Sequence, residues 1–278
     1  MKVLGVQIVT RRFGVGLYSN NDGPTPLRSR LQNDKPLREK QMKPRAIWAM
    51  ALSIVIGLNV QLATAQDNEA HNLGKSKIGN SAVTFVVHGY ENVDPAMDFG
   101  PLKAEFEKRG FACMIVRSPR TATKTPHQDR ANAVISALRD VKGDIALLGV
   151  SNQGLFLPLV AAARPVRRIV FVNALIPRPG KSYAEVFKTE QVFTTPQLLE
   201  YALKFPGMSE VCPLKELPKC EYVYISAEND EAVRPDWQQW AARTFLHVEP
   251  TVIKGASHGR ILLTNTQEVV DAAAKGLE

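Results

Sequence analysis

Ser151 occupies the position at which a serine nucleophile would be placed. An apolar, strand-like run ends at this serine, and helical spacing follows in residues 154–163. A serine between a buried strand and a helix is typical of a nucleophile elbow, usually written Gly-x-Ser-x-Gly. Gly149 fits that pattern, but Gln153 stands at the second glycine position and the next glycine is Gly154. Because an elbow packs tightly on a neighbouring strand, the pattern predicts that Gln153 turns its side chain away or widens the turn.

A serine hydroxyl needs a base to take its proton and an acid to orient that base. His258 lies in the loop "GASHGR", just beyond a strand-like run, and Asp230 follows the run "YVYISAE" by two residues. Since the carboxyl ends of parallel strands meet at one edge of a sheet, these side chains are expected to converge on Ser151. Glu228 and Glu231 compete with Asp230 as the acid, and Asp230 is preferred for its shorter side chain past the strand end.

The oxyanion of an acyl-transfer reaction needs backbone N–H donors. The sequence places one at Asn152, directly after the serine, and one at Tyr90, after the run "FVVHG". Gly89 allows the backbone to turn sharply there. His88 is interpreted as a structural, hydrogen-bonded histidine. The remaining histidines lack such a context and are predicted to lie on the surface or to pack: His71, His127 and His247.

Short β-branched runs alternate with segments of helical period from residue 83 onward, which is typical of a parallel sheet covered by helices. The predicted strands are residues 83–89, 111–118, 144–151, 167–174, 222–228 and 249–255. The predicted helices are residues 98–109, 128–141, 154–163, 236–245 and 266–277. Residues 177–220 break the alternation and are expected to form a small cap. Asp236 is expected in a helix first turn, with Trp237 and Trp240 packing against the sheet.

The N-terminal part of the chain has the pattern of a leader. Residues 46–60 are apolar, follow basic residues and precede the small residues "ATA", so residues 42–65 are predicted to be a secretory signal with cleavage before Gln66. Residues 1–41 are interpreted as unfolded or as a start assigned too far upstream, with Met42 as the true start. The mature protein, residues 66–278, would then be exported, either periplasmic or secreted. A retained anchor and a twin-arginine signal at "TRRF" remain alternatives.

Charge and motifs exclude several classes of function. The chain carries 35 Lys and Arg and 27 Asp and Glu, a net charge of +8, but residues 66–278 hold 25 basic and 24 acidic residues. The mature domain therefore offers no basic surface for nucleic acid. It has no His-x-x-His, Cys-x-x-Cys or Gly-x-Gly-x-x-Gly motif, so neither a metal nor another cofactor is predicted. The expected partner is a small-molecule ester, and the oligomeric state cannot be predicted.

The three cysteines give one open question. Cys113 lies in an apolar run and is predicted to be a buried thiol. Cys212 and Cys220 flank "PLKELPK" and in an exported protein could form a local disulfide, the alternative being two free thiols.

The combination of "FVVHGY", "LLGVSNQG", "IVFVNALIPRPGKSY", "YVYISAENDEAVRPDWQQWAA" and "GASHGRIL" resembles the α/β hydrolases. It is most similar to the small esterases that include plant methylesterases and hydroxynitrile lyases, over residues 82–275. Pro235, Gln238 and Ala242 echo the helix that follows the acid in that group, and Asn173, Ala174 and Pro177 echo its turn after the next strand. The resemblance implies an α/β-hydrolase fold and the chain order Ser, Asp, His.

The resemblance implies a cofactor-free serine hydrolase that cleaves carboxylic esters with Ser151, His258 and Asp230. Two rival functions remain. A non-catalytic ligand-binding protein of the same fold is favoured by Gln153. A hydroxynitrile lyase is disfavoured, because the lysine that usually follows the histidine in those enzymes is replaced by Gly259, with Arg260 next.

Overall fold

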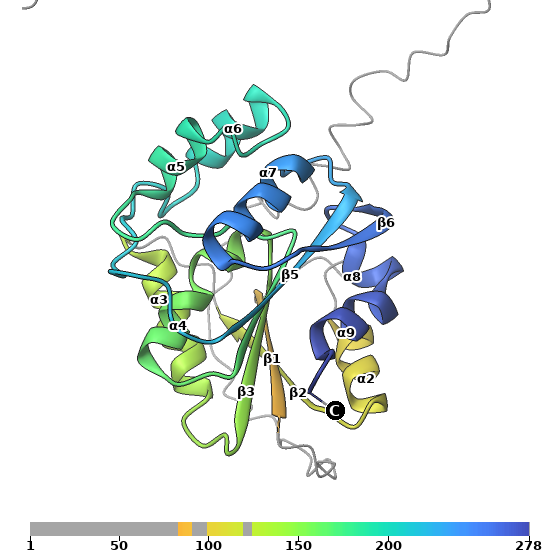
Figure 1. Ribbon diagram of the computed structural model, residues 1–278. Coiled ribbons are helices and arrows are strands. Elements are labelled where there is room, and N and C mark those ends of the chain that lie inside the picture. The colour runs from red at the N-terminus through yellow and green to blue at the C-terminus, as the bar shows by residue number, and fades with distance from the viewer. Residues whose placement is uncertain (1–82, 91–98, 119–123, 278) are drawn as a thin grey trace, which may run out of the picture. The chain divides into compact units, whose positions relative to one another are not determined.

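The computed structural model describes residues 83–90, 99–118 and 124–277 (Figure 1). The predicted leader segments 1–41 and 42–65, the start of the mature chain and His71 lie outside the described residues. Within the described ranges, no helix is long and apolar enough to cross a membrane.

A six-stranded sheet forms the centre of the domain, with every neighbouring pair of strands parallel. The spatial order is β2-β1-β3-β4-β5-β6. All six predicted strands are confirmed, with ends that shift by a few residues. Their bounds are β1 Val83–Tyr90, β2 Ala112–Ser118, β3 Asp144–Val150, β4 Arg168–Val172, β5 Glu221–Asn229 and β6 Thr251–Ser257.

The central strands are buried on both faces, which explains their nearly continuous apolar sequences. Alternate side chains enter two separate apolar clusters, because successive residues of a strand point to opposite faces. In β3, Ala146 and Leu148 join one cluster, whereas Ile145 and Leu147 join the other. The sheet is thus the middle layer of three.

Helices form the two outer layers (Figure 1). One face carries α2 Gly100–Lys108, α8 Ile261–Thr264 and α9 Thr266–Ala274, and the other carries α3 Pro126–Ala137 and α4 Leu157–Ala163. Proline stands in the first turn of several helices, where its missing N–H costs nothing. The predicted helix 236–245 is divided into α7 Pro235–Ala241 and the π-helical η3 Ala242–Leu246.

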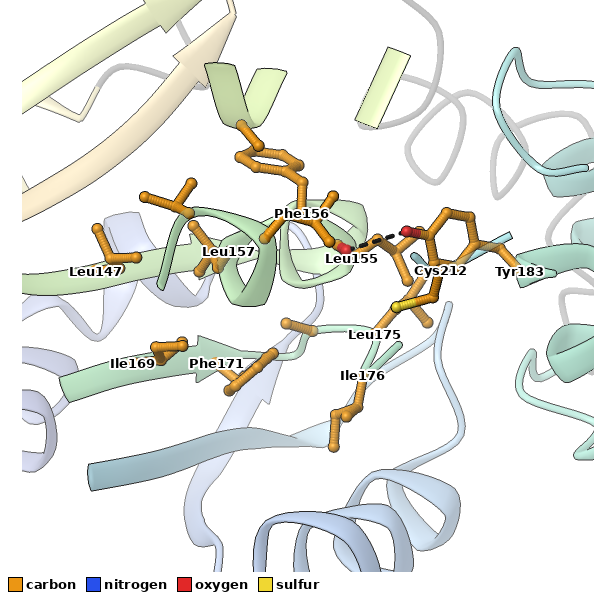
Figure 2. Packing of buried hydrophobic residues seen from close by; sticks show 14 of the residues in the cluster. Leu147, Leu155, Phe156, Leu157, Ile169, Phe171, Leu175, Ile176, Tyr183 and Cys212 are labelled. Carbon is orange, nitrogen blue, oxygen red and sulfur yellow. Dashed lines mark hydrogen bonds between the residues drawn. The ribbon is translucent and has the colours of Figure 1, made fainter. Parts of the chain in front are cut away.

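The segment between β4 and β5 contains two helices, α5 Tyr183–Thr189 and α6 Pro196–Leu203. Its base is attached to the main body beside η2 Ser151–Leu155, where the Tyr183 hydroxyl donates to the carbonyl of Leu155 at 3.3 Å (Figure 2). Leu155, Tyr183 and the buried Cys212 belong to one apolar cluster (Figure 2). This attachment fixes the segment between β4 and β5, called the insertion below, next to the residues that follow Ser151.

A second attachment point is built around an ion pair that lies within the insertion itself. Arg178 pairs with Glu190 at 2.7 Å, and the guanidinium lies 3.2 Å from the ring centroid of Phe245. The indole N–H of Trp237 in α7 donates to the same carboxylate at 2.9 Å. The insertion is therefore held against α7 and η3 by polar and cation–π contacts as well as by apolar packing.

The cysteines are free thiols in the structure. Cys113 is buried, as predicted, and its burial raises the pKa of the thiol to about 12. Cys212 and Cys220 are not joined, so the local disulfide considered from the sequence is not formed. Cys212, which belongs to the insertion, instead packs in the apolar cluster that also holds Leu155 and Tyr183.

Candidate active site

Ser151 is the first residue of η2, directly after β3. Its φ is 55°, in the left-handed region that a non-glycine residue adopts at a cost of about 1 kcal/mol. The turn is held by the N–H of Leu175, which donates to the carbonyl of Ser151 at 2.9 Å. A strained serine between a strand and a helix is the geometry of a nucleophile elbow, as the sequence predicts.

The close contact of the elbow falls at Gly154, and the expectation that it falls at position 153 is wrong. A Cβ built on Gly154 would lie 2.2 Å from the carbonyl oxygen of Leu175, so no side chain fits there. Gln153 is buried but turns back along the chain, and its Oε1 accepts from the N–H of Val150 at 2.8 Å. The glutamine thus stabilises the turn instead of widening it.

Three side chains from separate loops form one hydrogen-bonded chain. The Ser151 Oγ lies 3.0 Å from Nε2 of His258, and Nδ1 of His258 lies 2.7 Å from Oδ2 of Asp230. A carboxylate only accepts hydrogen bonds, so Nδ1 carries the proton and Nε2 is the free acceptor that faces the serine hydroxyl. The structure therefore brings together the three residues that the sequence selected.

Asp230 is buried, at 4% exposure, and its carboxylate meets four donors. Besides His258, the N–H groups of Ala232 and Val233 each donate to Oδ1 at 2.8 Å. The amide of Gln238 donates to Oδ2 at 2.8 Å. All four groups donate, so the carboxylate oxygens are fixed in place as acceptors and can orient the imidazole.

Two opposing effects act on the pKa of His258. Burial by itself would lower the pKa, since a charged imidazolium loses its hydration. The negative charge and the hydrogen bond of Asp230, with a further contribution from the charge of Glu231, raise it above its ordinary value. The imidazole is therefore a stronger base than a free histidine, which suits the removal of a serine proton.

The two glutamates considered as alternative acids have other contacts. Glu228 Oε2 accepts from the N–H of Gly255 at 2.9 Å, and Glu231 Oε2 accepts from the main-chain N–H of His258 at 3.0 Å. Neither carboxylate takes the place of Asp230 at the imidazole. Glu231 nevertheless belongs to the site, because it holds the same histidine by its backbone.

The proposed oxyanion donors follow adjacent strands. Tyr90 is the last residue of β1 and Asn152 is the second residue of η2, directly after β3. β1 and β3 are neighbours, with Val87 paired to Leu148. The two residues therefore stand at the carboxyl ends of neighbouring strands. Their role stays a prediction.

The other described histidines are structural or peripheral. His88 is hydrogen-bonded to the Ser118 hydroxyl at 2.8 Å, as a structural histidine should be. His127 is buried and packs edge-on against Tyr183. His247 is exposed and ends η3 with a left-handed backbone.

The tryptophan prediction is half right. Asp236 lies in the first turn of α7 and Trp237 is buried, as expected. Trp240 is 45% exposed and packs edge-on against Phe245 rather than against the sheet.

Sequence reasoning missed the support around the three residues. Gln238 and Asn173 were noted as echoes of related sequences, without a role. Asn173 has a left-handed φ of 47° and is fully buried, and its amide links the N–H of Ala227 to the carbonyl of His258. Their position at the carboxyl ends of strands or in the next helix turn is the one signal that could have found them.

Among the described residues, no group of three His, Cys, Asp or Glu is arranged to hold a metal ion.

Comparisons with known proteins support the fold. No protein-family model matches the sequence, and no curated protein matches it. Among solved structures, polyneuridine aldehyde esterase is 16% identical with a TM-score of 0.52, covering 68% of this chain and 98% of its own. A pyrethroid hydrolase is 14% identical with a TM-score of 0.50, covering 70% and 98%. An extracellular α/β-hydrolase from a Paenibacillus species is 20% identical with a TM-score of 0.49, covering 69% and 98%. The chain has the α/β-hydrolase fold.

Proposed function

We propose that the protein is a serine hydrolase that cleaves carboxylic esters of small or medium size. The observation that carries this proposal is the continuous chain of hydrogen bonds from Ser151 through His258 to Asp230, with lengths of 3.0 and 2.7 Å. The three residues come from loops after β3, β5 and β6, at the carboxyl edge of the sheet where ligands bind in open α/β folds.

In the proposed reaction His258 takes the proton of Ser151 as the hydroxyl oxygen attacks the ester carbonyl. Asp230 holds the ring and stabilises the imidazolium. The backbone N–H groups of Tyr90 and Asn152 donate hydrogen bonds to the carbonyl oxygen and stabilise the negative charge that develops on it. His258 then gives the proton to the leaving alcohol, and water attacks the acyl-enzyme with the same base.

The substrate class is proposed from the fold neighbours and the insertion. One fold neighbour is named as an esterase, polyneuridine aldehyde esterase, and another as a hydrolase of pyrethroids. The insertion with α5 and α6 is attached beside η2, through Tyr183 and Leu155. We assign it the role of a small cap over the site, which would limit the size of the acyl and alcohol groups. Export of the mature chain belongs to the same proposal.

Two rival functions are less well supported. A ligand-binding protein without catalysis was suggested by Gln153, but the elbow accommodates that residue through its hydrogen bond to Val150. A hydroxynitrile lyase would need a cation directly after His258, and that position is Gly259. Cyanide release from a cyanohydrin without ester cleavage would favour the lyase.

Ester hydrolysis by Ser151→Ala tests the proposal. The variant should lose about a millionfold in kcat on p-nitrophenyl esters, because the nucleophile is removed from a group of residues that act together. Ser209→Ala, at an exposed serine in the insertion, is the matched control and should behave like the wild type. Near-normal hydrolysis by Ser151→Ala would show that the mechanism is wrong.

A further inference from the structure

The loop after β5 contacts His258 at two places. Asp230 binds the imidazole, and the next residue, Glu231, accepts from the main-chain N–H of His258 at 3.0 Å. The backbone of Glu231 is itself fixed, because the Thr194 hydroxyl donates to its carbonyl at 2.6 Å. The Glu231 side chain therefore reaches the histidine from an anchored point, although it is exposed to solvent.

The other side of the His258 main chain is also held. Its carbonyl accepts from the amide of Asn173 at 3.2 Å, and that amide is anchored by the N–H of Ala227. Both polar groups of the His258 backbone are thus bound by side chains from other loops. The main chain that carries the imidazole is thus fixed at both of its polar groups, with the ring bonded to Asp230 and Ser151.

Glu231 also acts on His258 through its charge. Among the described residues, the charged groups hydrogen-bonded to His258 are the carboxylates of Asp230 and Glu231, and its other side-chain partners, Ser151 and Asn173, are neutral. After burial, which lowers the pKa of the imidazole, and Asp230, which raises it, the charge of Glu231 raises it further. The effect is moderated by solvent, since the carboxylate is exposed.

We propose that Glu231 is a positioning residue for His258: its carboxylate fixes the histidine main chain and adds a second negative charge beside the imidazole. This inference rests on the proposed function of the Ser151, His258 and Asp230 site. The Glu231 carboxylate would make two separate contributions. A neutral acceptor such as glutamine can replace its hydrogen bond, but it cannot replace its charge.

Glu228 offers a matched control. Glu228 is exposed and lies near the end of β5, two residues before Asp230. Like Glu231, it accepts a hydrogen bond from a main-chain N–H, in this case one in β6. That bond goes to Gly255 at 2.9 Å, three residues before His258. A general effect of removing a glutamate between β5 and β6 would therefore appear in Glu228 variants as well.

The test uses two readouts on Glu231→Gln, Glu231→Ala, Glu228→Gln and Glu228→Ala. One is the rate of inactivation by a fluorophosphonate as a function of pH. The other is the NMR titration of the His258 ring, recorded with each glutamate change in a Ser151→Ala background, which needs no catalysis.

Glu231→Gln keeps an acceptor but loses the charge, so its pH midpoint and the ring pKa should move lower while the limiting rate at high pH stays within about twofold. Glu231→Ala loses both, so its limiting rate should fall roughly fivefold in addition, the usual worth of one hydrogen bond. Both Glu228 variants should match the wild type in both readouts.

Unchanged titration and unchanged rates in the Glu231 variants would overturn the inference, as would equal effects in the Glu228 variants. A wild type that takes no label, combined with a ring pKa that responds to Glu231→Gln, would overturn the hydrolase proposal and leave the positioning role standing. If the fluorophosphonate labels the wild type but neither the labelling rate nor the His258 ring pKa responds to the Glu231 variants, the hydrolase proposal would stand and the positioning role of Glu231 would be overturned.

Discussion

His258 and His88 are both buried histidines near the carboxyl ends of strands of one sheet, at 2% and 1% exposure, yet their pKa values are shifted in opposite directions. Burial, followed by the charge of Arg130, lowers the pKa of His88 to about 3, and its hydrogen-bond partner Ser118 is neutral. At His258 the carboxylate of Asp230 outweighs burial and raises the pKa. Burial without an anionic partner therefore makes a histidine an inert neutral ring, and a buried carboxylate partner makes it a base.

His127 belongs with His88 in this comparison. It is fully buried beside Tyr183, and burial followed by the charge of Arg130 lowers its pKa to about 3. The guanidinium of Arg130 lies 3.3 Å from its Nδ1. A positive neighbour in place of a negative one thus adds to the effect of burial.

Among changes that test this comparison of histidines, the largest effect should come from removing the charge that distinguishes His258. Asp230→Asn keeps the size of the side chain but no longer stabilises an imidazolium, and it can reverse the tautomer by donating to Nδ1. The variant should lose about ten-thousandfold in kcat. The ring pKa of His258, followed by NMR, should fall below its ordinary value and resemble that of His88. A ring pKa that stays raised in Asp230→Asn would show that another group sets it.

A smaller effect concerns stability in acid, and it tests the other side of the comparison. A histidine whose pKa is lowered in the folded state binds fewer protons there than in the unfolded chain. As pH falls from 6.5 towards about 3, the unfolded state is therefore favoured by up to about 1.4 kcal/mol per pH unit for each of His88 and His127. The free energy of unfolding, measured with urea at a series of pH values, should decrease over this window.

His127→Phe makes that prediction specific, because phenylalanine keeps a ring beside Tyr183 but takes up no proton. Its free energy of unfolding should fall less steeply with decreasing pH than that of the wild type. His247→Asn, at an exposed histidine with a left-handed backbone that asparagine tolerates, is the control and should keep the wild-type slope. Equal slopes in His127→Phe and the wild type would show that His127 does not contribute to acid unfolding.

The strands and the three chemical residues could be predicted from sequence because each has a strong local signal. Strands buried on both faces have continuous apolar sequences, and Ser151 and Asp230 follow two such strands, β3 and β5. His258 follows the more exposed edge strand β6, whose β-branched residues still mark it as a strand. The chain order then matches the convergence of loops at one edge of the sheet.

The parts that could not be predicted depend on the exact path of the backbone. The close contact at Gly154, one residue later than expected, is set by the distance to the carbonyl of Leu175. The π-helical turn η3 interrupts a continuous helical pattern, and it leaves Trp240 exposed next to Phe245. The bond from Glu231 to the His258 backbone joins two loops whose separation has no signature in sequence.

The most direct test of Ser151 as an activated nucleophile is the intact mass of the protein after treatment with a fluorophosphonate, with peptide mapping of the modified residue. The pairing of Ser151 with the base His258 predicts a single adduct on Ser151, absent from Ser151→Ala and from His258→Ala and present in Ser209→Ala. A folded wild-type protein that takes no adduct, or an adduct that persists in Ser151→Ala, would contradict it.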